Sequence, residues 1–265
     1  MAKWNLPNDA RIALSVVVNV EEGSEMNIRD GDRGPEIVDE LGVALHKPVR
    51  NYSNESNYQY GLKAGAPRIM KLLDDYGIQA TFTAAAQALE RAPDLTKAIV
   101  AGNHEVCSHG YRWVHQYFMD EDKERDFIRK AIASIEATTG TRPYGWLSRY
   151  LLTDNTRRLL MEEGFTYHMD DFSDDRPFWD TDYEKPILIL PYALDSNDMK
   201  MWTAPSLTPA DWLQYAVDTL DWLYWEGKDD PQMMSFGLHL RIIGRPGRIG
   251  YLEKFLQHVT TMPDV

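Results

Sequence analysis

Short apolar runs recur along the chain and are typical of β-strands. Several are hydrophobic at nearly every position, as expected of strands that are covered on both faces of a sheet. We predict seven strands, over Ile12–Asn19, Ala80–Ala84, His104–Ser108, Tyr144–Leu147, Thr166–Asp170, Ile187–Leu190 and Met233–His239.

Longer segments with a helical spacing of apolar residues separate these runs. One of them has a clear start, because Thr208 is a favourable N-cap and Pro209 suits the first position of a helix. We predict helices over Ala66–Tyr76, Gln87–Ala101, Glu121–Thr139, Asn155–Glu163 and Pro209–Glu226.

This alternation of strands and helices predicts an α/β domain with a mostly parallel sheet, either doubly wound or closed into a barrel. Residues Glu22–Tyr60 interrupt the alternation, because they are polar, contain several Gly and Asn residues and have no clear period. A loop of this length inside a compact domain is usually functional. We therefore expect the segment to border the active site or a subunit interface.

The charge balance narrows the choice of partners. Among 265 residues, 41 are acidic and 28 are basic, which gives a formal net charge of −13. Such a chain is poorly suited to bind nucleic acid or an anionic membrane surface. No apolar run approaches the roughly 20 residues of a membrane span. We expect neither nucleic acid nor a membrane as a partner.

The first residues contain no apolar segment typical of a secretory signal. Cys107 is the only cysteine, so no disulfide can form within the chain. Both observations favour a cytoplasmic location.

Polar residues that could carry chemistry follow three of the predicted strands, where reactive groups of parallel α/β folds gather. Glu21 and Glu22 end the first strand, and adjacent carboxylates there can divide the roles of base and ligand. By itself, such a pair is more often a solvated acidic turn.

The second group follows the strand that ends at Ser108. His109 and His115 could reach one metal ion or one substrate from the same loop, since neutral imidazole is a good zinc ligand. Two unrelated histidines are an equally good explanation of this pattern alone.

The third group lies at the end of the last predicted strand. His239 ends an apolar run and would present its imidazole at the rim of the sheet, a good position for a general acid. A lone histidine at such a place is more often part of the core.

Taken together and in this order, the three groups resemble the motifs of the polysaccharide deacetylase superfamily, whose members share the NodB homology domain. The likeness extends over nearly the whole chain and is closest to the branch of the metal-independent type of allantoinase and the cyclic imide hydrolases. The segments that carry it are 19–23, 104–113, 174–179, 190–199 and the strand of His239. The resemblance implies one domain over residues 1–265, folded as a distorted barrel of seven or eight β/α units with a long N-terminal loop insertion.

The resemblance also implies roles for the acidic pair and the histidines. In the family a base is followed by a metal ligand, so Glu21 would be the base and Glu22 the ligand. The family has two histidine ligands four residues apart. His109 fits the first position, but Trp113 stands at the second, and the next histidine is His115. This departure leaves two alternatives: no metal, or one divalent ion, zinc by expectation, held by Glu22, His109 and His115.

For the remaining motifs the resemblance implies that His239 protonates the leaving nitrogen. It implies further that Arg149 supplies the arginine of the third motif. In amide hydrolysis, either backbone N–H groups or Arg149 would stabilise the oxyanion. The aspartates and the aromatic residue of the fourth motif would be Asp174, Asp175 and Trp179.

The leading functional interpretation is hydrolytic ring opening of a small cyclic amide, such as a cyclic imide, a hydantoin or an allantoin-like ureide. N-deacetylation of an amino sugar or of peptidoglycan is the alternative, and a non-catalytic binding protein on the same barrel is a third. Relatives of this branch also imply a homotetramer. A flat polar ring needs hydrogen bonds and aromatic faces, and the candidates to supply them are Asn19, Trp113, Trp146, Asn197 and Asp198.

Overall fold

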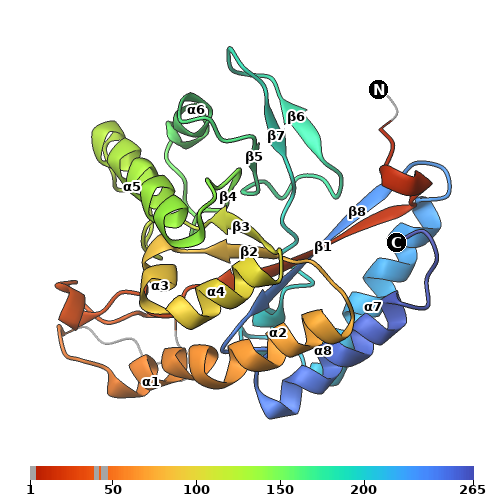
Figure 1. Cartoon of the computed structure of the whole chain (residues 1–265), viewed down its shortest axis with the longest axis horizontal. Helices are drawn as coiled ribbons and strands as arrows, with labels where there is room; N and C mark the ends of the chain where they lie inside the picture. The colour runs from red at the N-terminus through yellow and green to blue at the C-terminus, as the bar shows by residue number, and fades with distance from the viewer. Residues whose placement is uncertain (1–3, 39–41, 43–46) are drawn as a thin grey trace.

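A computed structural model of the chain describes residues 4–38, 42 and 47–265. In it, eight strands form one curled sheet that resembles half of a barrel, with helices packed on its outer side (Figure 1). The strand order is β6-β7-β5-β4-β3-β2-β1-β8, and every neighbouring pair is parallel except β6 and β7. The distorted α/β barrel predicted from the sequence is thus confirmed as a curled half-barrel.

All seven predicted strands are present, although β4 and β5 are short. The additional strand β6 pairs antiparallel with β7 and was not predicted, because its three residues are too few to show a periodic pattern. The strands are β1 (Ile12–Val20), β2 (Thr81–Ala84), β3 (Glu105–Ser108), β4 (Gly145–Trp146), β5 (Tyr167–His168), β6 (Phe178–Asp180), β7 (Ile187–Ile189) and β8 (Gln232–His239).

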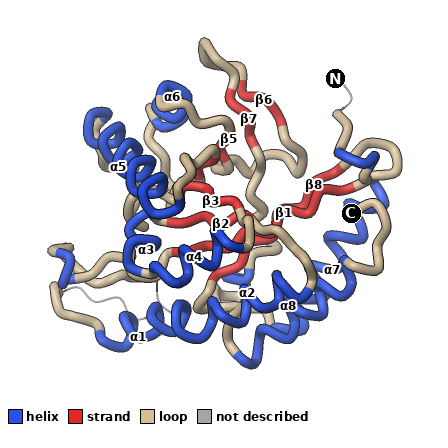
Figure 2. Tube along the Cα trace, viewed as in Figure 1, coloured by secondary structure: helices blue, strands red, loops and turns tan. Residues whose placement is uncertain are grey.

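The two longest helices have the predicted bounds. Thr208 and Asp211 form a reciprocal capping box at the start of the second of them. Pro93 splits the helix predicted over Gln87–Ala101 in two, because proline cannot donate the backbone hydrogen bond that a continuous helix needs. The helices, shown in blue in Figure 2, are α1 (Tyr52–Tyr60), α2 (Ala66–Asp75), α3 (Ala86–Arg91), α4 (Pro93–Ala101), α5 (Glu121–Thr139), α6 (Thr156–Glu162), α7 (Pro209–Glu226) and α8 (Pro246–Val259).

The segment Glu22–Tyr60 is more structured than predicted. It contains the 3-10 turn Ile28–Asp30 and ends in α1, which continues through the π-helical turn Gly61–Gly65 into α2. The prediction of one structureless loop was therefore wrong for these parts, and residues 39–41 and 43–46 lie outside the described residues. Helix α1 was not predicted because its sequence is mostly polar and has almost no apolar stripe along one face.

The register of the sheet places the sequence motifs side by side. Asn19 in β1 lies opposite His239 in β8 and, on its other side, opposite Thr83 in β2. Since parallel strands end at the same edge, the residues that follow them converge above the inner face of the sheet. No helix among the described residues is long and apolar enough to cross a membrane.

Candidate active site

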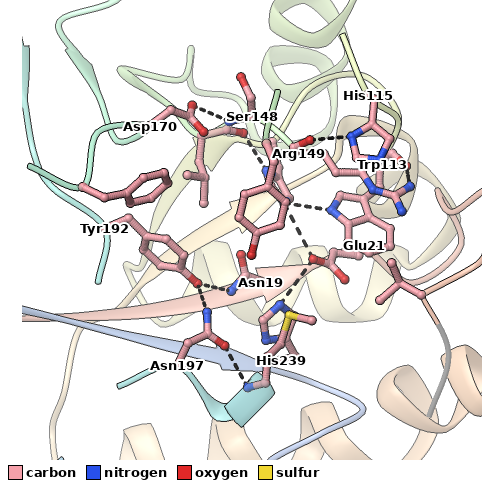
Figure 3. Close-up of a pocket in the computed structure, with 16 residues that line it drawn as sticks. Asn19, Glu21, Trp113, His115, Ser148, Arg149, Asp170, Tyr192, Asn197 and His239 are labelled. Carbon is pink, nitrogen blue, oxygen red and sulfur yellow. Dashed lines mark hydrogen bonds and ion pairs between the residues drawn. The ribbon is translucent and has the colours of Figure 1, made fainter. Parts of the chain in front are cut away.

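A pocket opens at the carboxyl ends of the strands and collects most of the predicted site residues (Figure 3). Val38, from the long N-terminal segment, contributes to its wall. Other lining residues are Asn19, Glu21, His109, Trp113, His115, Ser148, Arg149, Tyr150, Asp170, Tyr192, Asn197 and His239.

Glu21 is a buried carboxylate that lies close to one guanidinium group and two imidazole rings. Its Oε2 accepts a hydrogen bond from Arg241 at 2.7 Å, while Oε1 lies 3.4 Å from Nε2 of His239 and 3.7 Å from Nε2 of His109. Burial alone would raise the pKa of Glu21, but Arg241 and His239 hold it well below its ordinary value of 4.5. Glu21 is therefore ionised at neutral pH and has the form of a general base.

His239 is oriented by a second carboxylate on its far side. Asp198 accepts hydrogen bonds from Nδ1 of His239 at 2.7 Å and from the backbone N–H groups of His239 and Ile243. Burial lowers the pKa of His239, yet Asp198 and Glu21 raise it to about 9. A protonated imidazole with Nε2 facing the pocket suits a general acid.

Asp198 consequently does not have the substrate-binding role predicted for it. Its side chain is fully buried behind His239 and does not line the pocket. It fixes the orientation of the imidazole and stabilises its charged form.

His109 has both ring nitrogens occupied by protein groups. Nδ1 lies 2.6 Å from the carbonyl oxygen of Leu147, which can only accept, so Nδ1 carries the proton. Nε2 then accepts the indole N–H of Trp113 at 3.1 Å. The lone pair that a metal ion would use is therefore directed at a hydrogen-bond donor.

The predicted ligands Glu22, His109 and His115 are not brought together. Glu22 lies outside the pocket lining, where its carboxylate meets Arg241 at 3.4 Å and packs against the backbone of Gly61. His115 does line the pocket and donates from Nδ1 to the carbonyl of Arg149 at 2.9 Å. Among the described residues, no group of three His, Cys, Asp or Glu side chains is arranged to hold a metal ion. This donor set does not fit a divalent cation.

Arg149 lies in the pocket wall, but its guanidinium is already engaged. Nη1 and Nη2 form a bidentate ion pair with Glu36 at 2.7 and 2.6 Å, and Nη1 also donates to the carbonyl of Trp113. The guanidinium stacks on the Trp113 ring at 3.8 Å. The geometry does not support the predicted oxyanion role, and Arg149 instead fastens the N-terminal segment to the barrel.

Asn19 and Asn197, which are predicted to bind substrate, line the pocket and share one partner that was not predicted. Their amide groups both donate to the hydroxyl oxygen of Tyr192, at 3.0 and 2.8 Å. Burial raises the pKa of Tyr192 well above its ordinary value of 10, so the phenol keeps its proton. With both lone pairs of the oxygen occupied, the O–H group remains as a donor on the pocket wall.

Of the two tryptophans predicted to bind substrate, only Trp113 lines the pocket. Trp146 is fully buried in the core, where it packs edge-on against Phe127 and Phe165 and donates to Ser148. Its role was therefore mispredicted.

The fourth-motif residues expected at 174, 175 and 179 are also absent from the pocket. Trp179 lies in the edge strand β6 and is 60% exposed. Asp198 supplies the carboxylate next to His239 instead.

The sequence did not reveal Arg241, Tyr192 or Asp170 as site residues. Arg241 comes two residues after His239, and its role depends on β8 lying beside β1. Tyr192 and Asp170 follow short strands at the far side of the sheet, so only their position in space identifies them.

Comparison with known proteins identifies the family of the chain. Residues 55–168 match the polysaccharide deacetylase family model. A Schizosaccharomyces pombe protein assigned to the polysaccharide deacetylases is 34% identical over 98% of this chain and 88% of its own length. A peptidoglycan deacetylase of Helicobacter pylori is 27% identical over 74% of this chain and 78% of its own length.

Two crystal structures are similar over nearly the whole chain. One is a probable polysaccharide deacetylase from Pseudomonas aeruginosa PAO1 and the other is PuuE allantoinase. Each is 43% identical, has a TM-score of 0.94 and is matched over 98% of this chain and 88% of its own.

The fold, the acid–base pair and these relatives define a hydrolase that acts on carbon–nitrogen bonds other than peptide bonds. The chain belongs to the polysaccharide deacetylase family.

Proposed function

We propose that the protein hydrolyses a small cyclic amide, namely a cyclic imide, a hydantoin or an allantoin-like ureide, by opening one ring C–N bond. The observation that carries the proposal is the position of ionised Glu21 3.4 Å from Nε2 of protonated His239. A base and an acid so close together can act on the two ends of one amide bond.

In the proposed reaction Glu21 removes a proton from a water molecule, which attacks the ring carbonyl carbon. Arg241 keeps the carboxylate ionised and oriented. The tetrahedral intermediate collapses when His239 gives its proton from Nε2 to the ring nitrogen, and the C–N bond breaks. The products are an open-chain carboxylic acid and a free amide or ureido group.

The oxyanion of this intermediate needs a hydrogen-bond donor, and Arg149 is occupied by Glu36. The hydroxyl of Tyr192 is the best placed alternative, because Asn19 and Asn197 occupy its lone pairs and leave only its proton to donate. A fixed donor of this kind needs no reorganisation when the charge develops.

The residues that enclose the pocket favour a small cyclic substrate over a polymeric one. The N-terminal segment contributes Val38 to the pocket wall, and the ion pair between Glu36 and Arg149 holds this segment in place. A polymeric sugar chain would need an open groove along the strand ends. The 43% identity to PuuE allantoinase supports the same choice.

The experiment that tests the proposal is a hydrolysis screen of the purified protein over succinimide, hydantoin, allantoin and chitin oligomers. Release of ring-opened acids supports it. If the protein releases acetate from chitin oligomers and opens none of the rings, the N-deacetylase alternative is supported. The similarity to the Helicobacter pylori peptidoglycan deacetylase is the reason to include this alternative in the test.

We further propose a cytoplasmic homotetramer. The reduced, buried Cys107 agrees with the location, and exposed aromatic residues such as Trp179, Trp222 and Trp225 agree with subunit contacts. Light scattering of the protein in solution measures the subunit number, and cell fractionation measures the location.

A further inference from the structure

A second histidine–aspartate pair lies on the wall of the pocket opposite His239. His168 ends β5, and Asp170 follows it two residues later. Oδ2 of Asp170 lies 2.6 Å from Nε2 of His168, and both side chains are almost completely buried. Four strands separate β5 from β8 in the curled sheet, so that Asp170 and His239 face each other across the pocket (Figure 3).

This pair is oriented in the opposite sense to His239 and Asp198. There the imidazole faces the pocket and the carboxylate stands behind it. Here the carboxylate of Asp170 lines the pocket, while His168 is fully buried behind it. Within the described part of the chain, Nδ1 of His168 has no hydrogen-bond partner. The hydrogen bond of the His168 ring is therefore the one between Nε2 and Asp170. The arrangement presents an acceptor to the pocket rather than a proton donor.

The two carboxylate oxygens of Asp170 differ in their hydrogen bonds. Oδ2 accepts both the backbone N–H of Ser148, at 2.6 Å, and Nε2 of His168. No hydrogen bond formed by residues 4–38, 42 or 47–265 ends on Oδ1. The two fixed donors set the plane of the carboxylate, and Oδ1 is left as an acceptor on the pocket wall.

We propose that Asp170 is a specificity-determining residue, whose Oδ1 accepts a hydrogen bond from a ring N–H of the substrate that is not part of the scissile bond. The inference rests on the proposed cyclic amide hydrolysis and narrows its substrate class to hydantoins and ureides. A methylene group at this place would leave a buried carboxylate oxygen without a donor once the ligand excludes water, which is unfavourable. Sites built to bind an N–H group reject analogues without it for this reason.

Hydantoin and succinimide form a matched pair for the test. Both contain an imide N–H between two carbonyls, and succinimide has CH₂ where hydantoin has its second N–H. A hydrogen bond to a charged group commonly contributes enough to change kcat/KM by roughly 10- to 150-fold. We expect the wild-type protein to prefer hydantoin over succinimide by a factor in this range.

The variant Asp170→Asn should remove that preference. Ser148 and His168 both donate to the same position, so the amide oxygen should occupy it and the NH₂ group should face the pocket. An acceptor is then replaced by a donor of the same shape. We expect kcat/KM for hydantoin to fall about 100-fold, and kcat/KM for succinimide to change less than about threefold.

The matched control is Asp171→Asn, one residue further along the same loop. Asp171 binds Arg157 and Ser173 and does not line the pocket, so the preference for hydantoin should remain. Equal losses on both substrates in Asp170→Asn, or a wild-type preference for succinimide, would overturn the assignment. Failure of the wild-type protein to hydrolyse any cyclic amide would instead refute the proposed function itself.

Discussion

The indole N–H of Trp113 donates to Nε2 of His109 over 3.1 Å. The indole N–H of tryptophan can donate a hydrogen bond, but it has no lone pair with which to coordinate a metal ion. Its presence at the family's second ligand position therefore does two things: it removes one ligand and blocks the lone pair of the other.

This relationship predicts that catalysis survives removal of metal ions. Exhaustive chelation should leave kcat/KM within about twofold of its untreated value, and His115→Ala should not change the metal content, because no ligand set is assembled around either histidine. Elemental analysis before and after chelation provides the control. Loss of activity that zinc restores would contradict the prediction.

The two adjacent glutamates should differ sharply in mutagenesis. Glu21→Gln removes the base that faces the pocket, and we expect turnover to fall at least roughly 100-fold. Glu22→Gln should cost less than tenfold, since Glu22 lies outside the pocket and burial raises its pKa towards the neutral form that glutamine resembles. Steady-state kinetics of both variants decide the assignment, and a greater loss in Glu22→Gln would reverse it.

The pH dependence of kcat/KM should show a broad plateau. His239 acts in its protonated form, so activity should fall as pH rises through its pKa of about 9. Glu21 acts in its ionised form, so activity should fall only at acidic pH, below the ordinary glutamate pKa of 4.5.

Asp198→Asn should move the alkaline limb to lower pH, because the carboxylate that raises the pKa of His239 is lost. His239→Ala should lower turnover at least about 100-fold and abolish the limb. A limb that stays in place in both variants would show that another group titrates.

The hydroxyl of Tyr192 should matter for turnover more than for folding. Removing one oxyanion donor typically lowers kcat by about 100- to 1,000-fold, and we expect Tyr192→Phe to fall in this range with a nearly unchanged KM. Tyr167→Phe is the matched control, because Tyr167 is also buried but donates to Glu105, away from the pocket. Similar kinetics in the two variants would exclude a catalytic role of Tyr192.

We expect Arg149 to contribute to the stability of the folded protein rather than to catalysis. Arg149→Met leaves the buried carboxylate of Glu36 without its cation, and this should lower the free energy of unfolding by about 3–5 kcal/mol. The double variant with Glu36→Gln should recover part of the loss, as measured by urea denaturation. An oxyanion role would instead lower kcat at unchanged stability.

The sequence was informative wherever a local pattern determines the structure. The apolar runs located seven strands, and the cap at Thr208 located the start of α7. Family motifs identified Glu21 and His239 as candidates, and the fold brings their side chains within 3.4 Å of each other.

Roles that depend on distant partners were not predictable in the same way. Arg149 became an ion-pair residue because Glu36 lies beside it, although 113 residues separate them. Asp198 meets His239 across 41 residues. A sequence pattern identifies polar residues near a strand end, but it does not say which neighbour occupies each hydrogen-bonding atom.

The pairing of β1 with β8 also has a consequence for the order of events during synthesis. β1 pairs with β2 along one edge, and among the described residues its other edge pairs with residues 232–239, more than 200 positions further along the sequence. A ribosome-bound intermediate therefore exposes the valine-rich edge of residues 16–18 until residues 232–239 have been translated, and such an edge readily pairs with other chains. Glu21 and His239 meet only when β8 docks, so chains that lack residues 232–239 should need chaperone protection and should lack an assembled site.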